Sequence, residues 1–346
     1  MGQTRKGRPE RLGVRRRDHH APAGRGGGPR TGRRVSHARP PPSPSSVTAT
    51  ATVRDSGDTG DEAMTDRATL IAHRGFAGVY PENTELAVEA ASSGGPGTDT
   101  VHRRADMVEV DVVPTADGTL VAFHDDGLAE RDGGERGLTD AEGLVFETDT
   151  DTVTGATVLG TGETVPTLET VFEAVPPDVG VNLELKNPGS DDLRPAEPLS
   201  QQTLSAQRAL WRPYTERVLD LASEYDNEIL VSSFYEAALA AVRDYDDSVP
   251  VAFLFRDSIE AGLEVTRRYD CEAMHVPRNM VRGTPFFGDD YVDADLRDID
   301  LAAVAADEGR ALNVWTVSTW YQARELVRAG VDGLISDYPT VLSFQD

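Results

Sequence analysis

Three carboxylates in two short apolar segments have the spacing of a metal site. Glu109 and Asp111 are separated by one residue in the segment 107–113, and Glu184 stands in the similar segment 181–186. Residues two apart in a strand point to the same side, so Glu109 and Asp111 share one face. Carboxylates gathered inside a protein repel one another unless a cation joins them, and oxygen ligands suit Mg²⁺ or Ca²⁺. We therefore predict a Mg²⁺ or Ca²⁺ site at these three residues.

Two histidines stand at the ends of predicted strands. His73 closes Thr69–His73, and His124 closes Leu120–His124. A divalent cation near them would neutralise a phosphate oxygen during displacement at phosphorus. Two histidines can then divide the proton transfers, one taking a proton from the attacking water or hydroxyl and the other protonating the leaving alkoxide. The sequence does not say which histidine is the acid and which the base.

Two basic side chains also stand at the ends of expected strands. Arg74 comes directly after His73, and strand alternation places Lys186 on the same face as Glu184. Arginine offers a planar fork and lysine a point charge to phosphate oxygens. Lys186 is the only lysine after residue 63, where the other 20 basic side chains are arginine. Its position at an inward strand end indicates a task that requires a compact ammonium group.

Apolar runs that alternate with helical patterns are expected to position these residues. This order is typical of βαβ units, and eight such strands predict a TIM (β/α)₈ barrel, whose site forms at the carboxyl ends of the strands. A doubly wound sheet would require a glycine-rich phosphate turn, which residues 73–75 do not provide. The expected strands are 69–73, 107–113, 181–186, 229–234, 249–255, 273–276, 311–317 and 333–336, with 120–124 as an accessory strand. The expected helices are 84–91, 168–174, 203–225, 235–245, 259–269, 300–307 and 320–329.

Two segments are expected to be insertions, and two further histidines are expected outside the site. Residues 92–104 form a polar, glycine-rich loop that includes His102, which we expect at the surface. Residues 127–164 are long and acidic and follow the His124 strand, where they can shape access to the site. His275 lies on the sixth expected strand and is assigned to packing or to the barrel rim.

Charge divides the chain into two parts. Residues 1–63 hold 13 Lys and Arg against 6 Asp and Glu, whereas the remainder holds 21 against 53. Residues 1–65 are rich in Arg, Gly and Pro without apolar periodicity, so we predict a disordered tail, with Met64 as the expected true start, followed by a barrel over 66–346. The acidic, lysine-poor barrel predicts a halophilic source and excludes nucleic acid as a partner.

The rest of the sequence bears on membrane spans, export signals and disulfides. No run reaches the length of a membrane helix, so no membrane span is expected. The arginines at 15–17 are followed by no apolar stretch, so they do not predict an export signal. We therefore predict a cytoplasmic location. Cys271 is the only cysteine, which excludes disulfides within the chain.

The ordered set of motifs closely resembles the glycerophosphodiester phosphodiesterases. The resemblance runs from about Leu70 to the C-terminus, and no part of it covers residues 1–63. It rests on HRG at 73–75, PENT at 81–84, EVD at 109–111, HD at 124–125, ELK at 184–186, SSF at 232–234, WTV at 315–317 and GVDGLISDYP at 330–339. It departs from the family pattern at the two insertions, which remove no motif residue but leave the choice of substrate open.

The resemblance implies a TIM barrel that binds a divalent cation and hydrolyses glycerophosphodiesters to a glycerol phosphate and an alcohol, a reaction of lipid and glycerol metabolism. By position, it implies that His73 and His124 are the acid/base pair and that Glu109, Asp111 and Glu184 hold the metal. It also implies that Arg74 and Lys186 hold phosphate and that Trp315 lines the substrate site. Within PENT, Asn83 is expected to cap the following helix.

Two other functions fit parts of the sequence. A lipid-directed phosphodiesterase of the phospholipase D type, acting on lysolipids, would need an apolar rim, for which Phe286 and Phe287 are the only hint. A catalytically silent barrel that binds phosphodiesters should lack a histidine or a carboxylate, and none is missing. The sequence therefore favours an active enzyme with a small-molecule phosphodiester substrate.

Overall fold

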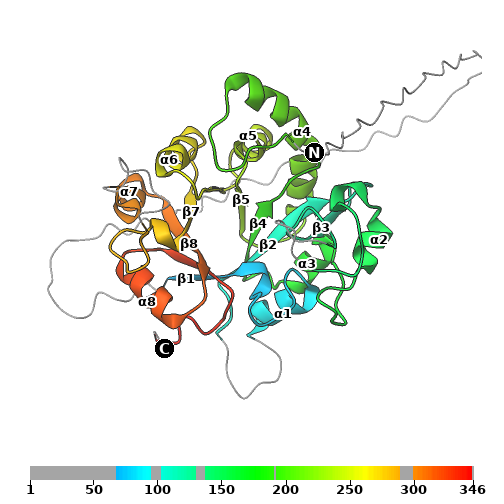
Figure 1. Ribbon diagram of the computed structural model, residues 1–346, viewed down its shortest axis with the longest axis horizontal. Coiled ribbons are helices and arrows are strands. Elements are labelled where there is room, and N and C mark those ends of the chain that lie inside the picture. The colour runs from blue at the N-terminus through cyan, green and yellow to red at the C-terminus, as the bar shows by residue number, and fades with distance from the viewer. Residues whose placement is uncertain (1–67, 95–102, 130–136, 191, 289–298, 345–346) are drawn as a thin grey trace, which may run out of the picture. The chain divides into compact units, whose positions relative to one another are not determined.

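The computed structural model describes residues 68–94, 103–129, 137–190, 192–288 and 299–344. Within these residues, eight parallel strands close into a barrel, because β1 pairs with β2 on one side and with β9 on the other (Figure 1). The TIM barrel predicted from the sequence is confirmed. The barrel strands are β1 (Thr69–Ala72), β2 (Met107–Pro114), β4 (Gly180–Leu185), β5 (Ile229–Ser233), β6 (Val251–Leu254), β7 (Ala273–Pro277), β8 (Ala311–Val317) and β9 (Gly333–Ser336).

Helices surround the barrel, and each predicted helix is present with bounds shifted by a few residues (Figure 1). Several begin where a hydroxyl side chain accepts a hydrogen bond from the first turn, as Ser200 and Ser258 do. Thr319 forms a full capping box with Gln322. The predicted helices are α1 (Glu85–Ser93), α3 (Leu168–Ala174), α4 (Gln201–Ala222), α5 (Glu236–Tyr245), α6 (Ile259–Arg268), α7 (Leu301–Glu308) and α8 (Trp320–Arg328).

Strand β2 separates apolar from acidic side chains by simple alternation. Its residues Val108, Val110 and Val112 are fully buried in the main core between the strands and the helices. Met107, on the opposite face, packs with Ile71 and Ile335 in a small cluster of its own. Glu109 and Asp111 share the face of Met107 and therefore point into the barrel.

The accessory strand β3 (Leu120–Ala122) carries the chain back along β2. It is the predicted accessory strand, and it pairs antiparallel with β2, with Ala122 opposite Val112. Beyond the strand, the backbone N–H of Phe123 donates to the carbonyl of Asp111 at 3.0 Å. His124, the next residue, is thereby placed beside the inward carboxylates of β2.

The long acidic insertion at 127–164 is a packed layer in its described residues. It contains a short 3-10 turn η2 (Val145–Glu147) and a helix α2 (Thr150–Gly155), neither of which was predicted. Its apolar side chains form a second core against the side of β3, and these are Leu128, Leu138, Val145, Val153, Ala156 and Val158, with Val113, Val121, Phe123 and Val165. The apolar residues are irregularly spaced, so neither a helical nor a strand period marks this layer in the sequence.

Several predictions fall wholly or partly outside the described residues. They are the tail at 1–65 with the question of Met64, His102, and most of the insertion at 92–104. The part of that insertion that is described begins as the end of α1, which continues to Ser93. In the described part of the chain, no helix combines the length and the apolar character needed to cross a membrane.

Candidate active site

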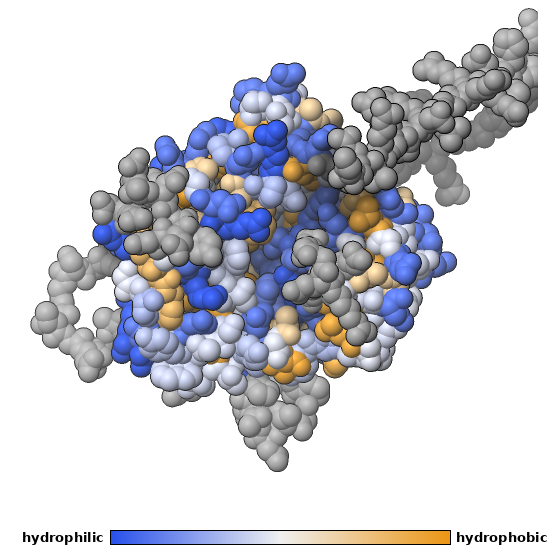
Figure 2. All heavy atoms as spheres, viewed as in Figure 1, coloured by the Kyte–Doolittle hydropathy of each residue, from blue (hydrophilic) through white to orange (hydrophobic). Residues whose placement is uncertain are grey.

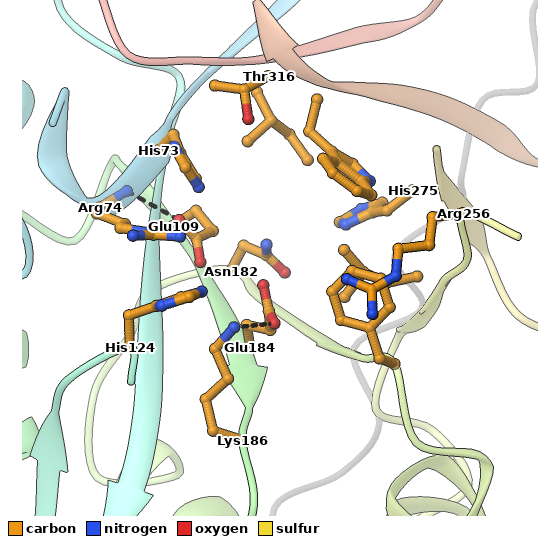
Figure 3. A pocket seen from close by; sticks show the side chains of 14 residues that line it. His73, Arg74, Glu109, His124, Asn182, Glu184, Lys186, Arg256, His275 and Thr316 are labelled. Carbon is orange, nitrogen blue, oxygen red and sulfur yellow. Dashed lines mark hydrogen bonds and ion pairs between the residues drawn. The ribbon is translucent and has the colours of Figure 1, made fainter. Parts of the chain in front are cut away.

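A pocket lies at the carboxyl ends of the barrel strands (Figure 3). Hydrophilic residues gather around the hollow in the middle of the barrel (Figure 2). Seven of the eight site residues predicted from the sequence line this pocket, and they are His73, Arg74, Glu109, His124, Glu184, Lys186 and Trp315. Asp111, the eighth, is fully buried and is in contact with Lys186 and Arg74.

His73 is held by a carboxylate from the opposite end of the chain. Strands β1 and β9 pair with Ala72 opposite Ser336, so the residues that follow the two strands, His73 and Asp337, meet. Nδ1 of His73 lies 2.7 Å from Oδ1 of Asp337. A carboxylate at Nδ1 fixes the proton there and leaves Nε2 as the free ring nitrogen. His73 points toward the carboxylate cluster in Figure 3.

His124 is held in the same way by its neighbour in the chain. Nδ1 of His124 lies 2.9 Å from Oδ1 of Asp125, whose side chain is 3% exposed against 26% for that of Asp337. The two histidines therefore both have a carboxylate at Nδ1 and Nε2 on the other side of the ring. They differ in how strongly the supporting carboxylate is withdrawn from water.

The three predicted carboxylates meet inside the barrel. The register of β2 against β4 places Asp111 directly beside Glu184, and Glu109 lies two pairs earlier, beside Asn182. One oxygen from each of Glu109, Asp111 and Glu184 lies within 4.8 Å of the others. Burial, followed by the charges of Asp111 and Glu184, raises the pKa of Glu109 well above its usual range.

Two cations balance part of this negative charge. Nζ of Lys186 lies 2.9 Å from Oδ1 of Asp111 and also pairs with Glu184. Nε of Arg74 lies 3.2 Å from Oδ2 of Asp111, and its Nη1 donates to Glu82 at 2.7 Å. Burial by itself would raise the pKa of Asp111, but Lys186 and Arg74 outweigh that effect and hold it far below its usual range. Burial likewise opposes the charge on Lys186, yet the two carboxylates raise its pKa.

Asn83 supports Asp111 and does not cap helix α1, contrary to the sequence prediction. Its Nδ2 donates to Oδ2 of Asp111 at 2.8 Å, and its Oδ1 accepts from the backbone N–H of Asp111. The cap is Thr84, whose hydroxyl accepts from the N–H of Ala87 at 3.2 Å. A cap has extended backbone angles, whereas Asn83 has a φ of 56°, in the left-handed region.

The turn η1 (His73–Gly75) aims a backbone donor at the cluster. Arg74 and Gly75 both have left-handed backbone angles, with φ of 50° and 74°. A Cβ on Gly75 would lie 2.7 Å from the backbone of Ala87 in α1, so only glycine fits this close approach. The resulting bend directs the N–H of Arg74 to Oε2 of Glu109 at 2.8 Å.

The far wall of the pocket is aromatic and basic. Phe234 and Trp315 meet edge to face, with ring centroids 5.8 Å apart. The guanidinium of Arg256 lies over the Phe234 ring, 5.5 Å from its centroid. His275 is fully buried beside this wall, and its Nε2 lies 3.0 Å from Nδ2 of Asn313. Burial lowers the pKa of His275 to about 3, so it is neutral near pH 7.

Sequence reasoning missed several of these residues. Asp337 was quoted only as part of the closing motif, and its contact with His73 depends on barrel closure. Asn182 and Arg256 carried no signal of their own, although Asn182 stands two residues before Glu184 and therefore shares its face. His275 was assigned to packing or to the rim, and it lies inside the barrel, where it lines the pocket.

The donor set fits a hard divalent cation. All three candidate ligands are carboxylates, which Mg²⁺ and Ca²⁺ prefer. Oε1 of Glu109 is buried and has no hydrogen-bond partner among the described residues. A buried carboxylate oxygen without a donor is costly, and a bound cation would remove that cost. The residues present are therefore those that such an ion would use.

A closed barrel with histidines and carboxylates around a pocket at its strand ends has the arrangement of a TIM-barrel enzyme. Residues 73–341 match the model of the glycerophosphoryl diester phosphodiesterase family. The chain belongs to this family and is a phosphoric diester hydrolase, a glycerophosphodiester phosphodiesterase, as its motifs predicted.

Relatives cover nearly the same part of the chain. A glycerophosphodiester phosphodiesterase of Bacillus altitudinis is 28% identical over 78% of this chain and 94% of its own length. One from Caldanaerobacter subterraneus is 26% identical over 80% of this chain and 96% of its own length.

Solved structures share the fold. An Oleispira antarctica phosphodiesterase in complex with the product sn-glycerol-3-phosphate has a TM-score of 0.59 at 24% identity, over 80% of this chain and 95% of that one. The Thermotoga maritima glycerophosphodiester phosphodiesterase has a TM-score of 0.57 at 21% identity, over 81% of this chain and 99% of that one.

Proposed function

We propose that this chain hydrolyses glycerophosphodiesters to a glycerol phosphate and an alcohol, with Mg²⁺ or Ca²⁺ as cofactor and His73 and His124 as the acid/base pair. The observation that carries the proposal is the matched support of the two histidines. Each has its Nδ1 fixed by a carboxylate, and both line the pocket that contains Glu109 and Glu184.

The histidines divide the proton work of the reaction. A ring whose Nδ1 is held by a carboxylate can exchange a proton at Nε2 without losing its orientation. One ring takes the proton from the attacking water or hydroxyl, and the other gives a proton to the alkoxide that leaves. Because Asp125 and Asp337 differ in burial, the two rings meet different electrostatic surroundings.

Glu109, Asp111 and Glu184 would hold the cation. When bound, a divalent cation supplies positive charge to a non-bridging phosphate oxygen. Lys186 and Arg74 contribute positive charge from the same side of the pocket, and both are ordered by ion pairs to Asp111. We infer that these two side chains hold the phosphate group, and that Trp315 packs against the substrate on the facing wall.

A small diester in water is favoured as the substrate. The Oleispira antarctica relative binds sn-glycerol-3-phosphate as its product, which supports glycerol phosphate as the product here. The Bacillus altitudinis and Caldanaerobacter subterraneus relatives are named for glycerophosphodiesters, so the lipid-directed alternative is not favoured. A place in lipid and glycerol metabolism, a cytoplasmic location and the exclusion of nucleic acid remain proposals that rest on sequence and charge.

The test is a product assay on the purified protein. Glycerophosphoglycerol and glycerophosphocholine are incubated in turn with EDTA, MgCl₂ and CaCl₂, at several salt concentrations, and glycerol phosphate is measured enzymatically. We expect release of glycerol phosphate with at least one of the cations and little with EDTA. Turnover of neither diester under any of these conditions would refute the proposal, and full activity in EDTA would refute the metal requirement.

A further inference from the structure

Arg256 is a basic side chain of the pocket that the proposed chemistry does not use. It follows strand β6, two residues after Leu254, and its guanidinium lies over the Phe234 ring, 5.5 Å from the centroid. Its one ion pair among the described residues joins Nε to Oδ2 of Asp257 at 3.5 Å. The Asp257 side chain is 70% exposed, so solvent screens that pair and the Nη groups remain available to a ligand.

The two walls of the pocket carry different charges. The acidic side chains among the described lining residues are Glu109 and Glu184, which come from β2 and β4. The wall that holds Phe234, Arg256 and Trp315 contains no carboxylate among its described lining residues. Figure 3 shows Arg256 and His275 on one side of the pocket, and His73, Arg74 and His124 on the other.

The position of Arg256 at the mouth indicates which arm of the substrate it meets. Asn182 and His275 are at most 1% exposed and close the pocket toward the barrel interior. The Arg256 side chain is 53% exposed and lies at the open end. A glycerophosphodiester has one constant arm, the glycerol, and one arm that varies in size. An arm of variable size needs the open end, so the head-group alcohol extends past Arg256.

We propose that Arg256 and Phe234 form a head-group subsite that favours uncharged or anionic alcohols, such as polyols, over quaternary ammonium alcohols. This proposal rests on the proposed function, because it concerns the leaving alcohol of that reaction. Aromatic faces and carboxylates are the groups that bind quaternary ammonium ions. Here the Phe234 face already carries a guanidinium, so a choline group would meet a like charge, whereas polyol hydroxyls would accept hydrogen bonds from Arg256.

The expected preference is modest because the guanidinium is half exposed. Charge pairs at exposed sites and cation–π contacts have effects that correspond to about two- to fivefold in an equilibrium or rate constant. We therefore expect kcat/KM for glycerophosphoglycerol to exceed that for glycerophosphocholine by about this factor. Raising the salt concentration should reduce the ratio, because ions screen exposed charges.

The test compares the ratio of kcat/KM for the two diesters in the wild type and in three variants. Arg256→Gln should bring the ratio close to one, mainly by improving the reaction of glycerophosphocholine. Arg256→Lys keeps the charge and should retain most of the preference. Arg328→Gln is the matched control, because that side chain is 59% exposed, stands at the end of α8 and is not among the described residues that line the pocket. It removes the same charge from the protein and should leave the ratio unchanged.

The outcomes separate this proposal from the proposed function. If kcat/KM falls equally for both diesters in Arg256→Gln, the proposal is overturned, since Arg256 would then bind the part that both diesters share. An unchanged ratio would also overturn it. Calorimetric Kd values of the two diesters for the protein in EDTA give a second readout without turnover. If the wild type hydrolyses neither diester, the proposed function fails, and the Kd ratio of wild type and Arg256→Gln still decides the role of Arg256.

Discussion

Asp337 lies with its Oδ1 2.7 Å from Nδ1 of His73, although 264 positions separate them in the sequence. The contact exists because β9 closes the barrel against β1, with Ser336 opposite Ala72. Barrel closure and the orientation of the His73 imidazole therefore depend on the same pair of strands. His124 has the adjacent Asp125 at its Nδ1. Both rings therefore have a carboxylate at Nδ1, which comes from a distant part of the chain for His73 and from the next residue for His124.

Removing the charge of Asp337 should disturb the reaction and leave the fold intact. In Asp337→Asn, the amide N–H can donate a hydrogen bond to an unprotonated Nδ1 of His73 and so stabilise the wrong tautomer, with the ring proton on Nε2. We expect kcat to fall by about 10²–10⁴-fold, with an altered pH profile and a thermal unfolding temperature close to that of the wild type. Asp178→Asn, which removes a carboxylate paired with Arg104 on the exposed surface, serves as the control. A fall in kcat no larger than that of the control would show that Asp337 does not orient His73.

Lys186 should stabilise the carboxylate cluster most strongly when no divalent cation is present. Lys186→Met leaves Asp111 and Glu184 without their ammonium partner, and loss of one member of a buried pair costs about 3–5 kcal/mol. The variant should therefore be destabilised in EDTA and should gain more from MgCl₂ or CaCl₂ than the wild type does. Thermal unfolding across a cation titration measures both effects.

Arg212→Met is the comparison for Lys186→Met, because Arg212 pairs with Glu216 on an exposed helix surface. It should change neither the stability in EDTA nor the response to cations. Equal cation responses of the wild type and Lys186→Met would argue against a cation at Glu109, Asp111 and Glu184.

The sequence was sufficient to predict the parts of the fold that regular patterns specify. Strand β2 is an example, because Val108, Val110 and Val112 alternate with its two acids, and the observed core follows that alternation. The layer at 127–164 could not be predicted, since Leu128, Leu138, Val145 and Val153 come together with no repeating interval. Residue spacing reports local periodicity, and contacts made by an irregular chain depend on the completed fold.

The site was predictable wherever its residues follow strand ends, as His73 and Lys186 do. Hydrogen bonds that hold a site residue from a different helix, strand or turn were harder to predict. Asn83 was expected to cap α1 on residue type alone, but its left-handed backbone turns its side chain to Asp111. Arg256 stands after a strand as well, yet arginine is so common in this chain that its identity carried no signal. The predicted halophilic source and the tail at 1–65 stay predictions.

His275 should make the protein sensitive to acid. Burial lowers its pKa to about 3 from an ordinary value of 6.5. Above pH 6.5 the residue is neutral whether the chain is folded or unfolded, and it adds no pH dependence. Between pH 6.5 and 3 the unfolded chain binds a proton that the folded chain excludes, so stability falls by about 1.4 kcal/mol per pH unit from this residue.

The variant His275→Gln keeps an acceptor for Nδ2 of Asn313 and removes the titrating group. Its free energy of unfolding, measured by urea denaturation from neutral to acid pH, should decline less steeply than that of the wild type. Parallel pH curves for the two proteins would show that His275 is not held neutral in the folded state.

The division of proton work between His73 and His124 is tested most directly by the leaving group. Rates of His73→Ala and His124→Ala are measured with glycerophosphoglycerol and with a p-nitrophenyl diester of glycerol phosphate, whose leaving group needs no proton. We predict that the rate of both variants with glycerophosphoglycerol falls by about 10²–10⁴-fold. Only the variant that lacks the general acid should regain its rate with the p-nitrophenyl diester. Full activity of either variant with glycerophosphoglycerol, or recovery of both variants with the p-nitrophenyl diester, would contradict the account.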